Sequence, residues 1–93
     1  MNRYRIFETP VFEKDFLKVT QPIRNQIRSK FNDYVYPQLR YEPHWGLNIK
    51  KLRNWKPETW RYQIGPWRAF YEIDENEKVV VITALEKRAD AYR

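Results

Sequence analysis

The spacing of apolar residues divides the first forty positions into a short strand followed by two helices. Residues 3–8 are compatible with a strand, and Thr9-Pro10 then offers an N-cap residue and a first-turn proline, so a helix is predicted over 10–18. A second start signal at residues 20–22 precedes apolar residues at helical spacing, which predicts a helix over 21–38 that Pro37 interrupts. We expect the two helices to form an antiparallel hairpin with a shared apolar stripe.

The second half of the chain predicts a long loop followed by a β-meander. Residues 40–58 follow neither the helical nor the strand period and are interpreted as a partly ordered loop. Two alternating runs then meet at Gly65-Pro66, and a Val-rich run over 78–85, predicted to be a central strand, follows the polar turn 75–78. The pattern predicts an α+β fold in one domain, 1–93, in which a small antiparallel sheet packs on the helices.

A two-residue turn at Gly65-Pro66 predicts which side chains share a face of this sheet. Ile64 would pair with Trp67, and the alternation along both strands follows from that pair. One face would carry Trp60, Tyr62, Ile64, Trp67, Ala69 and Tyr71, and the other Arg61, Gln63, Arg68 and Phe70. The first face suits the helices, and the second is a candidate phosphate-binding surface.

Composition and charge limit the kinds of partner and of reactive site that this chain can have. The net charge is +6, and residues 40–68 hold seven Lys/Arg and two acids, a local excess of five positive charges that favours an acidic partner such as nucleic acid. The absence of Cys excludes disulfides and thiolate chemistry, and a single histidine, His44, argues against a zinc site. No apolar run is long enough to span a membrane and the N-terminus lacks the apolar stretch of a signal peptide, so we expect a cytoplasmic protein. We expect no metal and no cofactor.

Each of these features also has a purely structural interpretation. Arg61 and Arg68 could lie on a solvated sheet face, and the cations of the loop, Lys50, Lys51 and Arg53, could be merely solvated. Trp60, Trp67 and Tyr71 are expected in the core rather than as base-stacking platforms, and His44 is expected to be structural or exposed. The acids around Glu75 belong to a predicted turn and match no metal-binding motif.

Three segments together resemble a known family. These are Lys50-Lys-Leu-Arg-Asn-Trp55, then Trp60-Arg-Tyr-Gln-Ile-Gly-Pro-Trp-Arg-Ala-Phe-Tyr-Glu-Ile73, then Lys87-Arg-Ala-Asp-Ala-Tyr-Arg93. The combination resembles the RelE/ParE superfamily of type II toxin-antitoxin toxins, in its RelE-like branch, over the whole chain. The resemblance implies a RelE-like fold and a ribosome-dependent mRNA endonuclease that needs no metal and is inhibited by a cognate antitoxin.

The resemblance also implies roles for individual residues. Arg68 and Arg88 match cations that stabilise the transition state, Arg61 matches a position used in catalysis or RNA binding, and Tyr92 matches a terminal tyrosine that stacks on a base or assists proton transfer. The candidate RNA-binding residues are Lys50, Lys51, Arg53, Gln63 and Lys87. The partners it implies are mRNA on the ribosome and an antitoxin whose acidic residues offset the basic face.

Two departures from the family pattern leave the general base open. Gln63 stands where some relatives have a lysine, and an amide cannot act as a base. Lys87 stands where many relatives have a histidine. Lys87, Tyr92 and Glu86 are the candidate bases, each of which would need a shifted pKa or a substrate positioned by the ribosome. The alternatives are a ParE-like inhibitor of DNA gyrase on the same fold and a non-catalytic RNA-binding module or decayed toxin.

Overall fold

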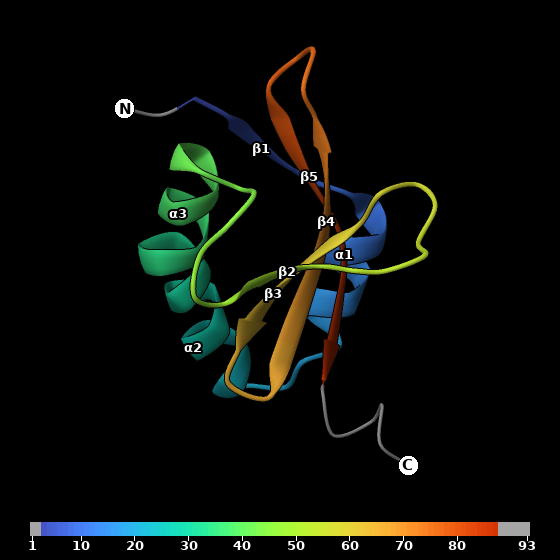
Figure 1. The fold of residues 1–93 in the computed structure, drawn as a ribbon. Helices are drawn as coiled ribbons and strands as arrows, with labels where there is room; N and C mark the ends of the chain where they lie inside the picture. Colours follow the sequence, from blue (N-terminus) through green and yellow to red (C-terminus); the bar gives the residue numbers. More distant parts are fainter. Residues whose placement is uncertain (1–2, 88–93) are drawn as a thin grey trace.

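A computed structural model describes residues 3–87, and these residues form a five-stranded sheet with helices packed against it (Figure 1). The elements follow the order β1 (Arg5–Glu8), α1 (Pro10–Leu17), α2 (Ile23–Lys30), a π-helical segment (Phe31–Val35), α3 (Tyr36–Tyr41), β2 (Ile49–Lys51), β3 (Trp60–Ile64), β4 (Trp67–Asp74) and β5 (Val79–Lys87). The α+β prediction, with an N-terminal strand, helices and a β-meander, is therefore confirmed.

The sheet has the strand order β1-β5-β4-β3-β2, in which β1 runs parallel to β5 and the other neighbours are antiparallel. The predicted hairpin register is confirmed at its four pairs, from Arg61 opposite Phe70 to Ile64 opposite Trp67, and the pairing continues to Trp60 opposite Tyr71. Gly65 has a φ of +54°, a conformation that glycine adopts without a steric penalty, which lets two residues close the hairpin. Strand β5 lies between β1 and β4, in agreement with its predicted interior position.

Helix α1 begins where the sequence predicts it. The Thr9 side chain accepts a hydrogen bond from the Phe12 amide at 3.1 Å, which satisfies one of the free N–H groups of the first turn. The same hydroxyl donates to the Ile82 carbonyl at 2.8 Å and so ties the helix start to β5. Phe12 and Phe16 are buried on the side of α1 that faces the sheet.

The second helix does not stop near Pro37 as predicted but continues to Tyr41, and Figure 1 shows α2 and α3 stacked in one column beside the sheet. The chain passes Pro37 through a π-helical turn, in which the Tyr36 amide donates to the carbonyl of Phe31, five residues back. A proline in a regular helix clashes with the carbonyl four residues earlier, and the wider turn relieves that clash.

The predicted loop over 40–58 is also partly wrong. Its first residues complete α3, and residues Ile49–Lys51 form β2, which pairs with β3 at the edge of the sheet. Three residues are too few for alternation to be recognised in sequence, and β2 owes its extended shape to the partner strand.

The core lies between the helices and one face of the sheet, the helix face. Phe31 packs against Phe12, Phe16 and Tyr36, with ring centroids 5.4–6.5 Å apart. Tyr71 is fully buried, and Trp60 and Trp67 pack against the core, so their predicted structural role is confirmed. The buried residues of this cluster are Tyr4, Phe12, Phe16, Val19, Ile27, Phe31, Val35, Tyr36, Leu39, Tyr62, Ile64, Ala69, Tyr71, Val80, Ile82 and Leu85. No helix within residues 3–87 is long and apolar enough to cross a membrane.

Candidate functional site: a basic groove on the open face of the sheet

The face of the sheet opposite the helices, the open face, carries a polar hollow of about 520 Å³. We call it the basic groove; its lining residues are Leu47, Asn48, Lys50, Leu52, Arg61, Gln63 and Arg68. Three neighbouring strands bring the polar residues together, because Lys50 of β2 lies opposite Arg61 of β3, and Gln63 of β3 lies opposite Arg68 of β4. Among the described residues the lining contains three cations and no carboxylate.

Arg68 is the most constrained cation of the groove. Its Nη2 donates to the Glu86 carboxylate at 2.8 Å, and its guanidinium carbon lies 5.5 Å from the centre of the Phe70 ring. Only 23% of the side chain is exposed, and its buried Nε–H has no hydrogen-bond partner among residues 3–87. The ion pair and the aromatic ring hold the guanidinium in one orientation at the lining of the groove, which suits a bound phosphate.

Two other polar side chains of the groove, those of Arg61 and Gln63, are held by backbone carbonyls. Arg61 donates through Nη1 to the Asn48 carbonyl at 3.3 Å, which ties β3 to the segment that precedes β2. Gln63 donates through its amide nitrogen to the Gly65 carbonyl at 2.6 Å. Its amide is neutral and cannot act as a base, but it can bind a substrate by hydrogen bonding.

The structure does not gather all the predicted site residues in this groove. Lys51 lies opposite Trp60 on the helix face, with its ammonium 5.6 Å from the Trp60 ring and 3.0 Å from Glu58. Lys87 lies opposite Trp67 on that same face, 5.8 Å from its ring. Arg53 lies in the loop 52–59, next to the groove, whereas Arg88 and Tyr92 lie outside the described residues. The groove therefore unites Lys50, Arg61, Gln63 and Arg68.

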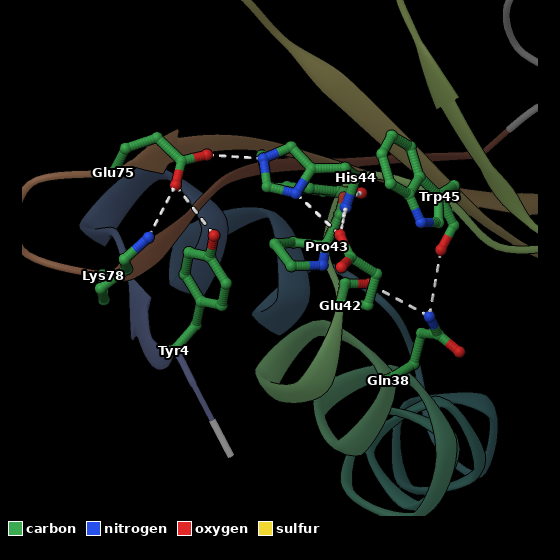
Figure 2. Close-up of polar contacts among 9 residues, drawn as sticks. Tyr4, Gln38, Glu42, Pro43, His44, Trp45, Glu75 and Lys78 are labelled. Atoms are coloured by element: carbon green, nitrogen blue, oxygen red, sulfur yellow. Dashed lines mark hydrogen bonds and ion pairs between the residues drawn. The ribbon is translucent and has the colours of Figure 1, made fainter. Parts of the chain in front are cut away.

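The only histidine in the sequence, His44, lies on the helix face of the sheet, where its ring centroid is 5.5 Å from that of Trp60. Its Nδ1 is 2.7 Å from Glu42 and its Nε2 is 2.5 Å from Glu75, and Figure 2 shows the imidazole held between the two carboxylates. Tyr4 and Lys78 bind the second oxygen of Glu75, at 2.8 Å and 3.3 Å. We call these five residues the histidine cluster; it joins the end of α3 to the β4–β5 turn.

The cluster shifts the titration of its members. Burial opposes a charge on His44, but the hydrogen bonds and charges of Glu42 and Glu75 outweigh it and raise the His44 pKa. The pKa of Glu75 is lowered, chiefly by the hydrogen bond from Tyr4. Burial raises this pKa by less than the Tyr4 bond lowers it, and the hydrogen bonds from His44 and Lys78 lower it further. His44 is thus structural, as one of the two sequence interpretations held, and it is unavailable as a base for the groove.

A stacked aromatic pair beside the groove was missed at the level of sequence. Trp55, from the loop 52–59, stacks on Phe70 with ring centroids 5.8 Å apart and an interplanar angle of 16°. One signal for it was present, because the predicted register placed Phe70 among polar residues on the open face, where a large aromatic side chain needs a cover.

Comparisons with known proteins agree with this architecture. Residues 6–92 match the sequence model of the family described as the ParE toxin of the type II toxin-antitoxin system parDE. Comparison with curated protein sequences gave no significant match.

The fold is similar to those of several solved toxins. A chain of the toxin-antitoxin complex RelBE2 from Mycobacterium tuberculosis superposes with a TM-score of 0.74 and 28% identity, over 97% of each chain. The archaeal RelE-RelB complex from Pyrococcus horikoshii OT3 gives a TM-score of 0.66 at 20% identity, over 92% of this chain and 96% of that one. The isolated E. coli RelE toxin gives 0.66 at 22%, over 96% and 90%. The chain belongs to the ParE toxin family of type II toxin-antitoxin systems, within the RelE/ParE superfamily.

Proposed function

We propose that this toxin is an endoribonuclease that cleaves mRNA on the ribosome. In the proposed reaction the ribose 2′-oxygen attacks the adjacent phosphorus, the bond from phosphorus to the 5′-oxygen breaks, and a 2′,3′-cyclic phosphate and a 5′-hydroxyl result. A base takes the 2′ proton, and an acid supplies a proton to the leaving oxygen. The observation that carries the proposal is the basic groove, in which Lys50, Arg61 and Arg68 surround one hollow. Independence of a metal ion is an implication of the RelE-like resemblance.

Arg68 is the residue best suited to stabilise the transition state. The phosphorane-like transition state carries more negative charge on its oxygens than the substrate does, and a cation already fixed in position stabilises it without reorganisation. Glu86 and Phe70 fix the Arg68 guanidinium at the lining of the groove. Arg61 and Lys50 would hold the substrate phosphates on either side.

Of the two candidate bases that the structure describes, Glu86 contacts a groove residue, through its ion pair with Arg68. Lys87 lies on the helix face. We assign the proton-accepting role to Glu86 and keep Arg88 and Tyr92, by the resemblance, as a second transition-state cation and as a base-stacking or proton-transferring residue. Arg88 follows directly after the end of β5 at Lys87.

The proposed partner that inhibits the toxin is a cognate antitoxin in the cytoplasm. The RelBE2 and Pyrococcus relatives are complexes of toxin and antitoxin. An acidic antitoxin segment would offset the net charge of +6, either across the basic groove or along an edge strand.

The proposal is tested by inducing the toxin in cells and mapping the 5′ ends of transcripts. We expect cuts in phase with codons, and a loss of about 10²-fold to 10³-fold in cleavage for Arg68→Ala, the range typical of a lost transition-state donor. Lys50→Ala and Lys14→Ala form a matched pair, since Lys50 lines the groove whereas Lys14 is exposed on helix α1, on the other side of the sheet. Only Lys50→Ala should reduce cleavage. Intact transcripts, or equal effects of the two lysine variants, would contradict the proposal.

A second candidate function is inhibition of DNA gyrase, which the ParE name of the matching family favours. That function predicts gyrase-dependent DNA breaks with intact mRNA. It gives no reason for Arg68 to be fixed beside a hollow of cations, so we place it second. Measurement of DNA breaks and of mRNA integrity in the same induced culture separates the two.

A further inference from the structure

The stacked pair Trp55 and Phe70 is unusual in where it lies. Phe70 is 7% exposed although its side chain points to the open face, and Trp55 covers it while keeping 52% of its own surface exposed. The indole is thus held in a fixed orientation by an aromatic ring on one side and remains accessible to solvent. Large exposed aromatic residues are typical of surfaces that bind a ligand or a partner.

Phe70 connects this pair to the basic groove. The same phenyl ring that stacks on Trp55 lies 5.5 Å from the guanidinium carbon of Arg68, and Phe70 pairs with Arg61 in the sheet. A second hollow of about 610 Å³ adjoins the groove, since Leu52 lines both. We call it the Trp55 hollow; its lining residues are Lys51, Leu52, Arg53, Asn54, Trp55, Lys56 and Glu58.

The charges of the Trp55 hollow indicate the chemistry of its ligand. Its one acid, Glu58, is ion-paired with Lys51 at 3.0 Å, whereas Arg53 and Lys56 form no ion pair with a described residue. Cations around an exposed aromatic ring are the combination with which proteins bind single-stranded nucleic acid, the cations following the backbone and the ring stacking on a base.

We propose that Trp55 is a stacking platform for a nucleobase of single-stranded RNA, next to the scissile phosphate that Arg68 and Arg61 bind. The proposal rests on the nuclease function proposed above and extends its substrate site from the groove over Leu52 into the Trp55 hollow. Every base has a stacking face, so Trp55 contributes affinity and position rather than base specificity. Codon preference must then come from other contacts.

The test is the binding of purified toxin to a fluorescein-labelled 2′-O-methyl RNA 12-mer, which lacks the 2′-hydroxyl nucleophile and so cannot be cleaved. Anisotropy titrations at several salt concentrations give the Kd and the slope of log Kd against log salt. We expect Trp55→Ala to weaken binding roughly 5-fold to 100-fold, the range for a lost base stack. Trp55→Phe, which keeps an aromatic ring, should stay within about 3-fold of the unchanged toxin.

The salt slope separates stacking from charge. Trp55→Ala removes no phosphate contact, so its slope should equal that of the unchanged toxin, whereas Arg61→Ala should lower the magnitude of the slope by about one. Trp45→Ala is the matched control, because Trp45 is also exposed but lies beside His44 and away from Phe70. Circular dichroism of each variant establishes that it is folded.

The outcomes distinguish the two proposals. Three results would overturn the stacking platform. Trp55→Ala could bind the RNA as tightly as the unchanged toxin, Trp45→Ala could lose as much affinity as Trp55→Ala, or the unchanged toxin could fail to bind the RNA. A Trp55→Ala variant that binds RNA normally but no longer copurifies with the antitoxin would also overturn it, in favour of an antitoxin anchor. Stacking without any cleavage in cells would instead refute the nuclease proposal and leave the platform standing.

Discussion

The histidine cluster should make the stability of the toxin depend on pH through a single residue. His44 contacts Glu42 through one ring nitrogen and Glu75 through the other. An imidazolium has an N–H on both nitrogens and can donate to both carboxylates, whereas neutral imidazole has one and would turn a lone pair toward the second carboxylate. The substitution His44→Gln removes the charge at every pH and keeps one hydrogen-bond donor group.

The size of the effect follows from exposure. Shielded hydrogen bonds to charged groups contribute about 1.5–3 kcal/mol, and exposed ion pairs at most about 1 kcal/mol. The side chains of His44 and Glu42 are 26% and 24% exposed, and that of Glu75 is 50% exposed. The shielded contact with Glu42 should therefore contribute about 1.5 kcal/mol, and the more exposed contact with Glu75 less than about 1 kcal/mol. Together the two contacts should stabilise the folded state by about 2 kcal/mol. For a chain of this length that corresponds to a Tm shift of about 10 °C.

The sign of the pH dependence follows from the raised pKa of His44. The stabilisation by the imidazolium is complete below its unfolded value of 6.5 and is lost as the pH rises through the higher folded value. The two carboxylates have the opposite pH dependence, because the pKa values of Glu42 and Glu75 are lowered below 4.5. The stability that these carboxylates contribute is lost only as the pH falls through those lowered values. The cluster is therefore strongest between pH 4.5 and 6.5.

Thermal unfolding of the toxin and of His44→Gln, followed by circular dichroism between about pH 5.5 and pH 9, measures the effect. The Tm of the variant should lie about 10 °C below that of the toxin at the acidic end, and the gap should fall to half or less at the basic end. Glu77→Gln is the control, because Glu77 lies in the same turn but does not contact His44. A gap between toxin and His44→Gln that is the same at both ends would refute the reasoning.

Two further predictions concern buried and half-buried polar contacts. Tyr71→Phe removes the hydroxyl that donates to the Pro43 carbonyl at 2.7 Å and leaves a buried acceptor unpaired, so we expect a loss of about 1–3 kcal/mol in urea unfolding. Tyr62→Phe is its control: the Tyr62 hydroxyl bonds to no described residue, and its loss should cost less than about 0.5 kcal/mol. Glu8→Gln weakens the carboxylate to which Arg28 donates at 2.7 Å and Tyr36 also donates, and we expect a loss of about 1–2 kcal/mol by the same measurement. Each prediction would be contradicted if its variant, Tyr71→Phe or Glu8→Gln, lost less unfolding free energy than Tyr62→Phe.

Much of the fold could be predicted from local patterns, because each of those elements carries its own signal. Thr9 and Pro10 specify a helix start, and the period of two around Gly65-Pro66 allows one register that separates Arg61 and Arg68 from the tryptophans. What failed were features decided by contacts distant in sequence. Strand β2 exists through its pairing with β3, and the helix passes Pro37 because a π-turn makes room for it.

The candidate site could be predicted only as far as that register reached. Arg61, Gln63 and Arg68 were assigned to one face correctly, but the face of Lys50 and Lys51 depends on β2, which the sequence did not reveal. Lys87 lies on the helix face because it is one residue beyond Glu86, and a shift of one residue in a strand reverses the face. The contact of His44 with Glu75 joins residues 31 positions apart, and no local spacing encodes it.

The sheet separates the groups that stabilise the fold from those proposed to act on RNA, and this separation leads to one last prediction. His44 is the only side chain with an ordinary pKa near neutrality in the sequence, but it is on the helix face and occupied by two carboxylates. Cleavage per folded molecule should therefore be the same in His44→Gln as in the toxin at every pH at which both are folded. Transcript-end mapping at a temperature well below both Tm values measures this, and a selective loss of cleavage in His44→Gln would show that the two faces of the sheet are coupled. Under the proposed mechanism, proton transfer then depends on groups whose ordinary pKa values lie far from neutrality, and cleavage requires a substrate that the ribosome positions.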